Sequence, residues 1–563
     1  MGTISDKLMR IINTKEDIRQ ALISKGYDVP TSIPFKEYAK MISDLPCRVD
    51  SFPDIEGIVA RYSALGLTNE QMATNPVWVD KTGNGYDLQL KNFSWKGMSG
   101  VGGYGDENHQ TFYKFTLDDY VFIATPPGVK HMNFTFRVTG LQPGNKLTLA
   151  FFGTTNTVYG TWNKDGIYTV DADIVEAGKP TYFYNGYGAT RGEFTIEILP
   201  LYPGALVFDG VDDYGVCENF PILTKEKGYT VVALRQWIEE KNDSTALVSN
   251  CKNWNQDGAF LFEYNNLRIN FLNVAISFGH VSSVDRGKSP FSYQTSKLYN
   301  GKNIKPGSFI GSNELVVGRG NKDFPTVSNA AIWEIVILDH DATEEELTKI
   351  KDYFVKTYPW LFPDQAWTVV GKTNEDEDRA TIANITGNGN DLILSNFGFI
   401  EGSGYNEEGE YAGYLVTDGV DDKIISSIFK MGNDWTVIGD WELINTGKND
   451  NAGIVKFDSI VIYNYNYNYN SMLINIKNGR NILIPDQNTV NAICPDGRIY
   501  SKDWKESIYN EETESTSKNF LTIGYSGNAY AKIAFKNLAI YPTVLSREDC
   551  IKAYNYLQTL KAK

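Results

Sequence analysis

Two stretches of this chain repeat each other, and this repeat constrains the fold more than any other feature of the sequence. The segment 82–88, TGNGYDL, recurs at 386–392 as TGNGNDL, 304 residues further on, and an Asn-Phe pair follows each copy at 92–93 and 396–397. A repeat of this length in an aromatic- and glycine-rich chain indicates a duplicated domain. The sequence therefore predicts one type of domain that occurs twice.

The spacing between the copies changes along the chain. The segment DGVDD at 209–213 recurs at 418–422, and LVVG at 315–318 is matched by LTIG at 521–524, so the spacing falls to 209 and then 206 residues. The first copy therefore carries about 95 extra residues, at about 111–201. This segment holds strand-like runs at 132–139, 146–152, 166–171 and 193–199 between turn signals, which predicts an inserted β-sandwich.

Each copy ends with an apolar strand followed by a helix start signal. Thr343 precedes Glu346 by three positions, and Ser546 precedes Asp549 in the same way, which predicts N-capped closing helices. Between the copies, Pro359 and Pro363 indicate a short, stiff connection. The predicted domains are a helical segment at 1–48, a first sandwich at 53–110 plus 202–361, the insert at 111–201, and a second sandwich at 362–563.

Composition agrees with a mainly β protein of several domains. With 563 residues the chain is too long for one core, and its 34 Tyr, 29 Phe and 50 Gly favour strands and turns. The net charge of −16 repels nucleic acid, and no apolar run reaches the ~20 residues that a membrane-spanning helix needs. The five widely spaced cysteines predict neither a disulfide framework nor a zinc site, and we expect them to be buried small side chains.

The first 48 residues have apolar positions at helical spacing. They are too few for a core of their own, so we expect them to bury this stripe against an assembly partner. The predicted docking residues are Leu8, Ile11, Ile12, Ile18, Leu22, Phe35, Tyr38 and Ile42.

The repeated motifs resemble those of laminin-G-like, concanavalin A-like sandwiches. The likeness rests on the Gly-Asn-Gly turns, the DGVDD segments, the strands LVVG and LTIG, and the final strand before a capped helix. It covers most of the chain, and it implies tandem jelly-roll sandwiches. The segment 13–21, NTKEDIRQA, followed by Pro30, Pro34 and Phe35, is similar to the N-terminal segment of structural and fibre proteins of tailed phages, including crAss-like phages of Bacteroidales.

The second resemblance implies a place in a virion. We then expect the N-terminal segment to bind other virion proteins, and the sandwiches to bind a glycan of the host surface or of mucus. A homo-oligomer is expected, with a trimer as the usual fibre symmetry. The sequence begins without a signal-peptide apolar region, which fits synthesis in a bacterial cytoplasm and release by lysis. A purely architectural role in a capsid or tail remains the alternative.

Catalytic motifs are not found in the sequence. Glycosidases of concanavalin type commonly carry Glu-x-Asp-x-Glu on one strand, and no such run occurs. His109, His131, His280 and His340 are isolated, with no spacing typical of a metal ligand or a catalytic triad. The sequence therefore predicts a protein that is not an enzyme, with a glycan-cleaving depolymerase as a further alternative.

The acidic repeats offer a possible calcium site, although no cofactor is otherwise expected. Carboxylate oxygens are calcium ligands, but Asp-Gly-Val-Asp is equally a turn between strands, and the structural interpretation is favoured. The candidate ligands are Asp209, Asp212 and Asp213 in the first copy and Asp418, Asp421 and Asp422 in the second.

A stretch of alternating Tyr and Asn near the end of the chain is the leading candidate for carbohydrate binding. On a strand, tyrosines would line one face and asparagines the other, which suits the stacking and hydrogen bonding of sugars. An exposed or subunit-contacting strand is the competing interpretation. The candidates are Tyr463, Tyr465, Tyr467, Tyr469, Asn464 and Asn466, with Trp95, Tyr104, Tyr184 and Tyr187 as weaker ones.

Overall fold

The computed structural model describes most of residues 52–562. The segments outside the description are 1–51, 105–111, 116–119, 124–130, 142–145, 152–156, 164, 174–180, 186–193, 224–226, 240–244, 252–257, 264–288, 304–311, 322–325, 408–410, 428, 431–433, 446–452, 458–459, 465–471, 477–479, 485–489, 496–497, 502–505, 509–517, 520, 524, 527–528 and 563. The predicted helical segment at 1–48, with all eight predicted docking residues, lies outside the described residues.

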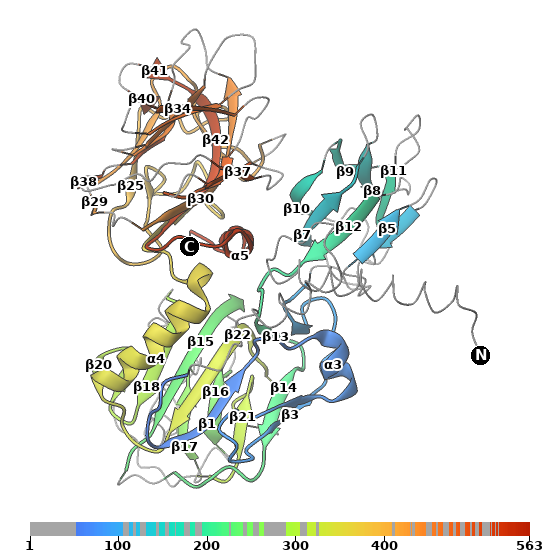
Figure 1. Ribbon diagram of the computed structural model, residues 1–563, viewed down its shortest axis with the longest axis vertical. Helices are drawn as coiled ribbons and strands as arrows, with labels where there is room; N and C mark the ends of the chain where they lie inside the picture. The colour runs from blue at the N-terminus through green and yellow to red at the C-terminus, as the bar shows by residue number, and fades with distance from the viewer. Residues whose placement is uncertain are drawn as a thin grey trace, which may run out of the picture.

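The protein is mainly β, with antiparallel pairing in its sheets, which confirms the predicted fold class (Figure 1). An eight-stranded and a six-stranded sheet enclose the first sandwich core. The larger sheet contains β20 (Lys302–Asn303), β19 (Leu298–Tyr299), β18 (Phe291–Thr295), β15 (Thr230–Glu239), β22 (Asn329–Leu338), β13 (Leu206–Asp209) and β4 (Gly100–Val101), with β1 (Ile58–Ser63) also paired to β22. The smaller contains β17 (Gly258–Phe262), β16 (Val248–Cys251), β21 (Leu315–Val317), β14 (Tyr214–Cys217), β3 (Leu88–Lys91) and β2 (Val77–Trp78).

The second sandwich repeats this topology. Its first sheet contains β26 (Gly404–Tyr405), β27 (Leu415–Val416), β42 (Lys532–Tyr541), β30 (Thr436–Asn445), β35 (Val490–Ile493), β36 (Arg498–Ser501) and β37 (Glu506–Ile508), with β23 (Gln365–Thr368) paired to β42. Its second contains β24 (Thr381–Ile382), β25 (Leu392–Ser395), β28 (Lys423–Ser426), β39 (Thr522–Ile523), β31 (Gly453–Phe457), β32 (Ile460–Asn464), β33 (Met472–Ile476) and β34 (Arg480–Ile484). Two ribbons pair β29 (Phe429–Lys430) with β38 (Lys518–Asn519) and β40 (Tyr525–Ser526) with β41 (Ala529–Tyr530).

The strand registers of the two sandwiches match. Leu206 pairs with Ile332 in the first, and Leu415 pairs with Phe535 in the second. The central pairs β15–β22 and β30–β42 each carry two register shifts, and the shifts fall at corresponding positions. The duplication seen in the sequence therefore recurs in strand order, register and irregularities.

The insert forms two four-stranded sheets around its own aromatic core. One has the order β10 (Gly166–Asp173), β7 (His131–Thr139), β12 (Phe194–Leu199) and β5 (Phe112–Phe115), and the other has β6 (Tyr120–Ile123), β11 (Thr181–Asn185), β8 (Leu147–Phe151) and β9 (Thr157–Trp162). The core includes Phe134, Phe136 and Phe183, which are fully buried. Strands near the four predicted runs are present, and β5, β6, β9 and β11 are additional.

The insert joins the first sandwich through a neck of two hydrogen-bonded chain segments at 102–103 and 201–202. Leu201 N donates to Gly103 O at 2.8 Å, and Tyr202 N donates to Gly102 O at 2.8 Å. Beyond the neck, β4 and β13 continue as neighbours in the sheet. The chain therefore leaves the host sandwich and returns to it at one place, between two adjacent strands.

The closing strands are apolar on both faces because both faces are covered. In β22, Ile335 and Ile337 face the sandwich core, whereas Val336 and Leu338 face the helical side. Among the described residues, the helices are α3 (Asn69–Thr74), α4 (Glu344–Thr357), η4 (Pro359–Leu361) and α5 (Arg547–Gln558). Thr343 caps α4 in a capping box with Glu346, and Ser546 caps α5, as the sequence predicts.

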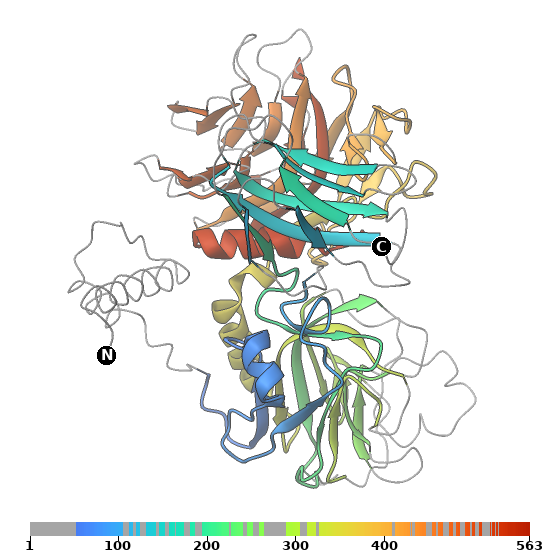
Figure 2. The same cartoon turned by 90° about the vertical axis from the view of Figure 1, so that its right-hand side faces the viewer.

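The two sandwiches share one apolar cluster at their junction. Figures 1 and 2 show α4 running along the first sandwich toward α5, which lies beneath the second. The cluster contains Tyr358 and Trp360 from the connection, Ile438 and Ala539 from the second sandwich, and many α5 side chains. Ile167 and Leu199 of the insert belong to it too. Gln236 Nε2 also donates to Thr559 Oγ1 at 3.1 Å across the junction.

Cys217, Cys251, Cys494 and Cys550 are buried thiols, in agreement with the sequence, and Cys47 lies outside the described residues. In the part of the chain that the structure describes, every helix is too short or too polar to cross a membrane.

Candidate functional site

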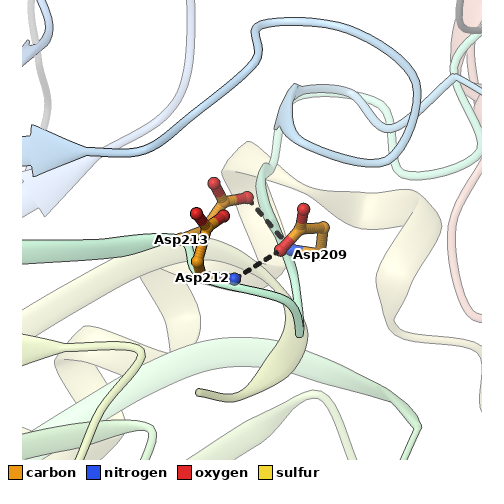
Figure 3. Close-up of side chains that lie close together, drawn as sticks. All are labelled: Asp209, Asp212 and Asp213. Atoms are coloured by element: carbon orange, nitrogen blue, oxygen red, sulfur yellow. Dashed lines mark hydrogen bonds between the residues drawn. The ribbon is translucent and has the colours of Figure 1, made fainter. Parts of the chain in front are cut away.

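The duplicated acidic segments form two equivalent turns. In the first, between β13 and β14, Asp209 Oδ1 accepts the amides of Val211 at 2.7 Å and Asp212 at 3.4 Å, and Asp213 Oδ2 accepts the amide of Asp209 at 3.1 Å (Figure 3). Gly210 has φ 74°, a conformation that glycine adopts without steric cost. These contacts explain why Asp, Gly and Asp recur in the segment.

The second turn repeats these contacts between β27 and β28. Asp418 Oδ1 accepts the amides of Val420 at 2.7 Å and Asp421 at 3.2 Å, while Asp422 Oδ2 accepts the amide of Asp418 at 2.7 Å. Gly419 has φ 77°. Each turn is thus held by its own carboxylates.

The last aspartate of each turn is buried, and its pKa is raised. Burial raises the pKa of Asp213 to about 8, and the nearby carboxylates of Asp209 and Asp212 contribute. Burial likewise raises the pKa of Asp422 to about 6. Ser99 Oγ donates to Asp213 Oδ1 at 3.0 Å, so both oxygens of Asp213 are hydrogen-bonded. A buried acid inside an acidic turn favours the protonated form.

The structure brings the repeated Asn-Phe pair to these turns, which the sequence alone did not indicate. Asn92 Nδ2 donates to Asp212 O at 3.1 Å, and Asn396 Nδ2 donates to Asp421 O at 3.0 Å. Both asparagines have positive φ, 67° and 70°, a region that Asn tolerates better than most residues. Two separate sequence motifs therefore form one structural unit in each sandwich.

A cation could be held only by the few carboxylate oxygens that the turn leaves open. The three carboxylates of each turn have oxygens within 4.8 Å of one another, so the predicted calcium ligands do come together. Calcium, however, takes six to eight oxygen ligands, and the backbone and Ser99 already engage one oxygen of Asp209 and both oxygens of Asp213. The donor set fits a self-capped turn better than a calcium cage.

At the tip of each turn an apolar side chain is exposed. Val211 is 72% exposed and Val420 is 71% exposed. Single exposed apolar residues are common on proteins, so neither valine alone defines a binding site.

The Gly-Asn-Gly turns are structural elements that fasten the first strands. Asn84 Nδ2 donates to Val59 O at 2.9 Å, and Asn388 Nδ2 donates to Asp364 O at 2.7 Å. Asp87 accepts the amide of Asp80 at 2.8 Å, and Asp391 accepts the amide of Asn384 at 2.8 Å.

The aromatic candidates are placed differently from one another. Trp95 is 9% exposed and stacks on Phe93 at 4.9 Å, which makes it a core residue. Tyr104 packs against the insert core, and burial raises its pKa to about 12, whereas Tyr184 in β11 is half-buried. The backbone of Tyr463 and Asn464 ends β32, paired with β33, which agrees with a strand at that place. Tyr465, Asn466, Tyr467, Tyr469 and Tyr187 lie outside the described residues.

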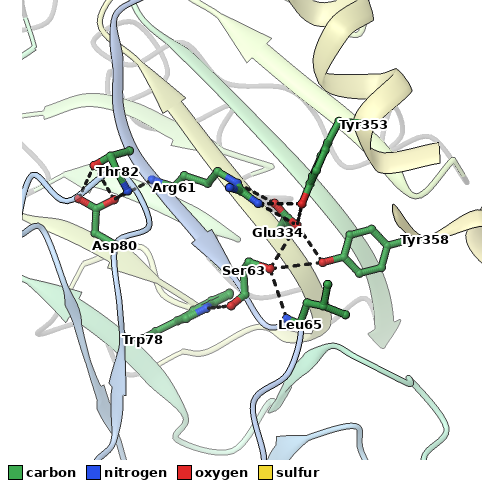
Figure 4. A network of polar contacts seen from close by, with 9 residues as sticks. All are labelled: Arg61, Ser63, Leu65, Trp78, Asp80, Thr82, Glu334, Tyr353 and Tyr358. Carbon is green, nitrogen blue, oxygen red and sulfur yellow. Dashed lines mark hydrogen bonds and ion pairs between the residues drawn. The ribbon is translucent and has the colours of Figure 1, made fainter. Parts of the chain in front are cut away.

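The first sandwich contains two buried ion pairs that were not predicted from the sequence. Arg61 Nε donates to Glu334 Oε2 at 3.1 Å, and Glu334 Oε1 also accepts the hydroxyls of Ser63, Tyr353 and Tyr358 (Figure 4). Burial raises the pKa of Glu334 against the opposing effect of the Arg61 guanidinium. This network links β1 and β22 to α4 and the connection.

The second ion pair joins Arg235 of β15 to Glu263, which directly follows β17. Arg235 Nε donates to Glu263 Oε2 at 2.8 Å, and Trp237, Ser292 and Tyr299 donate to the same carboxylate. Burial alone would raise the pKa of Glu263, but the guanidinium of Arg235 and these donors lower it to about 2. No local sequence signal could reveal either pair, because the partners come from separate strands.

Comparisons with known proteins give no family. No protein-family model and no curated protein matches the chain. Among solved structures, Trypanosoma rangeli sialidase in complex with sialic acid aligns over 78% of this chain and 81% of its own at 9% identity and a TM-score of 0.24. A GH54 α-L-arabinofuranosidase soaked with a cyclic sulfate inhibitor aligns over 32% and 50% at 14% identity, with a TM-score of 0.22.

The binding domain of botulinum neurotoxin serotype D aligns over 88% of this chain and 97% of its own at 10% identity and a TM-score of 0.18. For the first two sialidase structures, the alignment spans 42% and 44% of their length. Two of the proteins named are glycosidases, but at these TM-scores the likeness carries no conclusion for this chain.

The raised pKa of Asp213 gives a prediction that separates the turn from a cation site. Between the pKa of about 4 in the unfolded chain and about 8 in the folded protein, only the folded protein keeps the proton. The contribution of Asp213 to stability is therefore full below about pH 4 and is lost as the pH rises to about 8. Asp213→Asn should remove this loss, so that the stability of the variant relative to the unaltered protein rises by up to about 1.4 kcal/mol per pH unit between pH 5 and pH 8.

Urea unfolding at pH 5, 6.5 and 8, in buffer treated with a chelator, measures this effect. Asp212→Asn, at the exposed position of the same turn, is the matched control and should keep most of the pH dependence. If calcium instead stabilises the unaltered protein at pH 8 and not Asp213→Asn, the turn is a calcium site and the structural interpretation is wrong.

Proposed function

We propose that this protein is a non-catalytic structural or fibre component of a tailed-phage virion whose sandwiches bind carbohydrate of the host surface or of mucus. The observation that carries the adhesive part is the junction: two copies of one sandwich are joined by a shared apolar core and hold a fixed relation. A fixed pair of like modules presents two surfaces at constant spacing, which raises avidity for a repetitive ligand such as a polysaccharide.

The non-catalytic part is supported by the state of the buried acids described. Glu263 and Glu334 are enclosed by donors from their own sandwich, and Asp213 is hydrogen-bonded on both oxygens. A glycosidase needs two carboxyl groups facing a substrate about 5–10 Å apart. These three acids instead hold strands, helix and turn together.

The phage origin, the docking of the N-terminal segment and the trimer rest on the sequence resemblance. The glycan rests on the alternating Tyr and Asn residues, of which Tyr463 and Asn464 end β32. A purely architectural capsid or tail protein is the alternative that the same rigid junction would also serve. Imaging of particles labelled at the N-terminus would show where the chain docks.

The proposal predicts glycan binding that depends on the tyrosine rings. On an array of bacterial capsular and mucin glycans, the full chain should bind at least one class. Tyr465→Ala with Tyr467→Ala should weaken this binding about thirtyfold, because each ring contributes about 1 kcal/mol of stacking. The matched Tyr465→Phe with Tyr467→Phe variant keeps the rings and should retain most of the affinity.

Product analysis of the same glycans distinguishes the alternatives. Chains of unchanged length after incubation agree with an adhesin, whereas shortened chains would establish a depolymerase. Absence of binding to every glycan, together with a position in the capsid or tail body, would favour the architectural role.

A further inference from the structure

Two of the buried thiols lie together where α5 meets the second sandwich. Cys494 directly follows β35, and Cys550 lies in the first turns of α5, 56 residues further along the chain. Their side chains are 2% and 0% exposed and belong to the same apolar cluster at the junction.

Thr436 and Leu545, which are hydrogen-bonded to each other, each lie against one of the two sulfur atoms. Thr436 Oγ1 lies 3.7 Å from Cys494 Sγ and accepts the amide of Leu545 at 2.9 Å. Cys550 Sγ in turn lies 4.0 Å from Leu545 O. The thiols of Cys494 and Cys550 are themselves hydrogen-bonded. The two sulfur atoms are therefore neighbours. Cys494 follows the end of β35, and Cys550 lies in α5.

The first sandwich shows that the fold does not require these cysteines. Gln294 pairs with Val231 as Ile493 pairs with Val437, so Thr295 corresponds to Cys494. Counted from the N-caps Thr343 and Ser546, Leu347 corresponds to Cys550. Thr230 Oγ1 accepts the amide of Ala342 at 2.7 Å, just as Thr436 accepts that of Leu545. The same scaffold is thus built with Thr and Leu in one copy and with two thiols in the other.

We propose that Cys494 and Cys550 are an oxidation site, where a low-molecular-weight disulfide converts the two thiols into a disulfide that fastens α5 to the sheet. A disulfide needs a sulfur separation of about 2.05 Å, and rotation of two side chains already in hydrogen-bond contact supplies the remaining approach. The inference goes beyond the proposed function, and it would hold for any protein that leaves a reducing cytoplasm.

The reaction proceeds by two exchanges. One cysteine, as its thiolate, attacks a sulfur of the oxidant, forms a mixed disulfide and releases one small thiol. The second cysteine loses its proton and attacks the protein sulfur of the mixed disulfide, which releases the other small thiol. The protein loses two hydrogens in total, and the oxidant is reduced to two thiols.

The surroundings make this reaction slow inside a folded protein. The hydrogen bond from Cys494 and burial both raise the pKa of the Cys550 thiol. The thiolate fraction, and with it the rate, should increase roughly tenfold per pH unit up to that pKa. The reduced pair thus persists through synthesis and oxidises over longer exposure to an oxidant.

Mass spectrometry of the oxidised chain tests the proposal. The full chain carrying Cys47→Ser is incubated with oxidised glutathione at pH 7 and pH 8.5 below its unfolding temperature, unfolded in denaturant and alkylated. We expect two fewer alkyl groups than in the untreated chain, a peptide linking 494 to 550, and faster conversion at pH 8.5. Closing a loop of this length should raise Tm by about 5–10 °C.

The double variant Cys494→Thr with Cys550→Leu is the matched control, because it installs the pair that the first sandwich uses. Its Tm should not change on oxidation. Full alkylation of 494 and 550 after complete exposure to the oxidant, or linkage of either to Cys217 or Cys251, would overturn the proposal. The mass readout uses the unaltered pair, so it decides even where the control variant does not fold.

Discussion

Replacing Trp360 with alanine is expected to lower the free energy of unfolding by about 3–5 kcal/mol and to separate the unfolding of the two sandwiches. The side chain is 1% exposed at the centre of the shared cluster, its ring meets Tyr358 at 5.5 Å, and Lys552 Nζ lies 4.5 Å above it. Removal of the indole leaves a cavity between the two sandwiches and weakens the apolar contact that couples their unfolding.

Calorimetry of the full chain measures this effect. The unaltered protein should show one transition or two that overlap closely, and the variant should show two resolved transitions. Phe362→Ala, at the half-buried end of the same connection, is the matched control and should cost clearly less. A single unaltered transition in Trp360→Ala would show that the shared cluster does not couple the sandwiches.

Glu263→Gln is expected to destabilise the first sandwich by about 3–5 kcal/mol, because it leaves the buried guanidinium of Arg235 without a counter-charge. Arg235 and Glu263 are 2% and 1% exposed, and the carboxylate accepts from four side chains. The amide that replaces one oxygen also turns its N–H groups toward these donors.

Urea unfolding at pH 7 gives the magnitude, and the pH dependence gives a second check. Because the pKa of Glu263 is lowered to about 2, its contribution is present above the unfolded value of about 4.3 and is lost as the pH falls toward 2. The double replacement of Arg235 and Glu263 with leucine removes both charges and should be less harmful than Glu263→Gln. Equal losses would mean that packing, and not the buried charge, dominates.

Much of the fold follows from the sequence because the duplication is written in local turn chemistry. Gly210 and the caps Thr343 and Ser546 each act within a few residues of themselves, so their patterns predict their structures directly. Half of the strands of the insert were not predicted, since short edge strands such as β5 and β6 have no clear alternation.

The candidate site was predicted only in part. The acidic turns were recognised, but their union with Asn92 and Asn396 depends on strands that are distant in sequence. The buried pairs Arg61–Glu334 and Arg235–Glu263 were missed because charges are expected on the surface and their partners are found only by folding. The contact between the thiols of Cys494 and Cys550 was missed for the same reason, because the two residues are distant in sequence.

The neck between Gly102 and Tyr202 allows the first sandwich to carry an inserted domain between two adjacent strands. In the second sandwich the corresponding strands β26 and β27 are closed by a short hairpin, where Asn406 N donates to Tyr414 O at 2.8 Å. A domain inserted or removed at this position would therefore leave the strand pairing of the host sandwich unchanged.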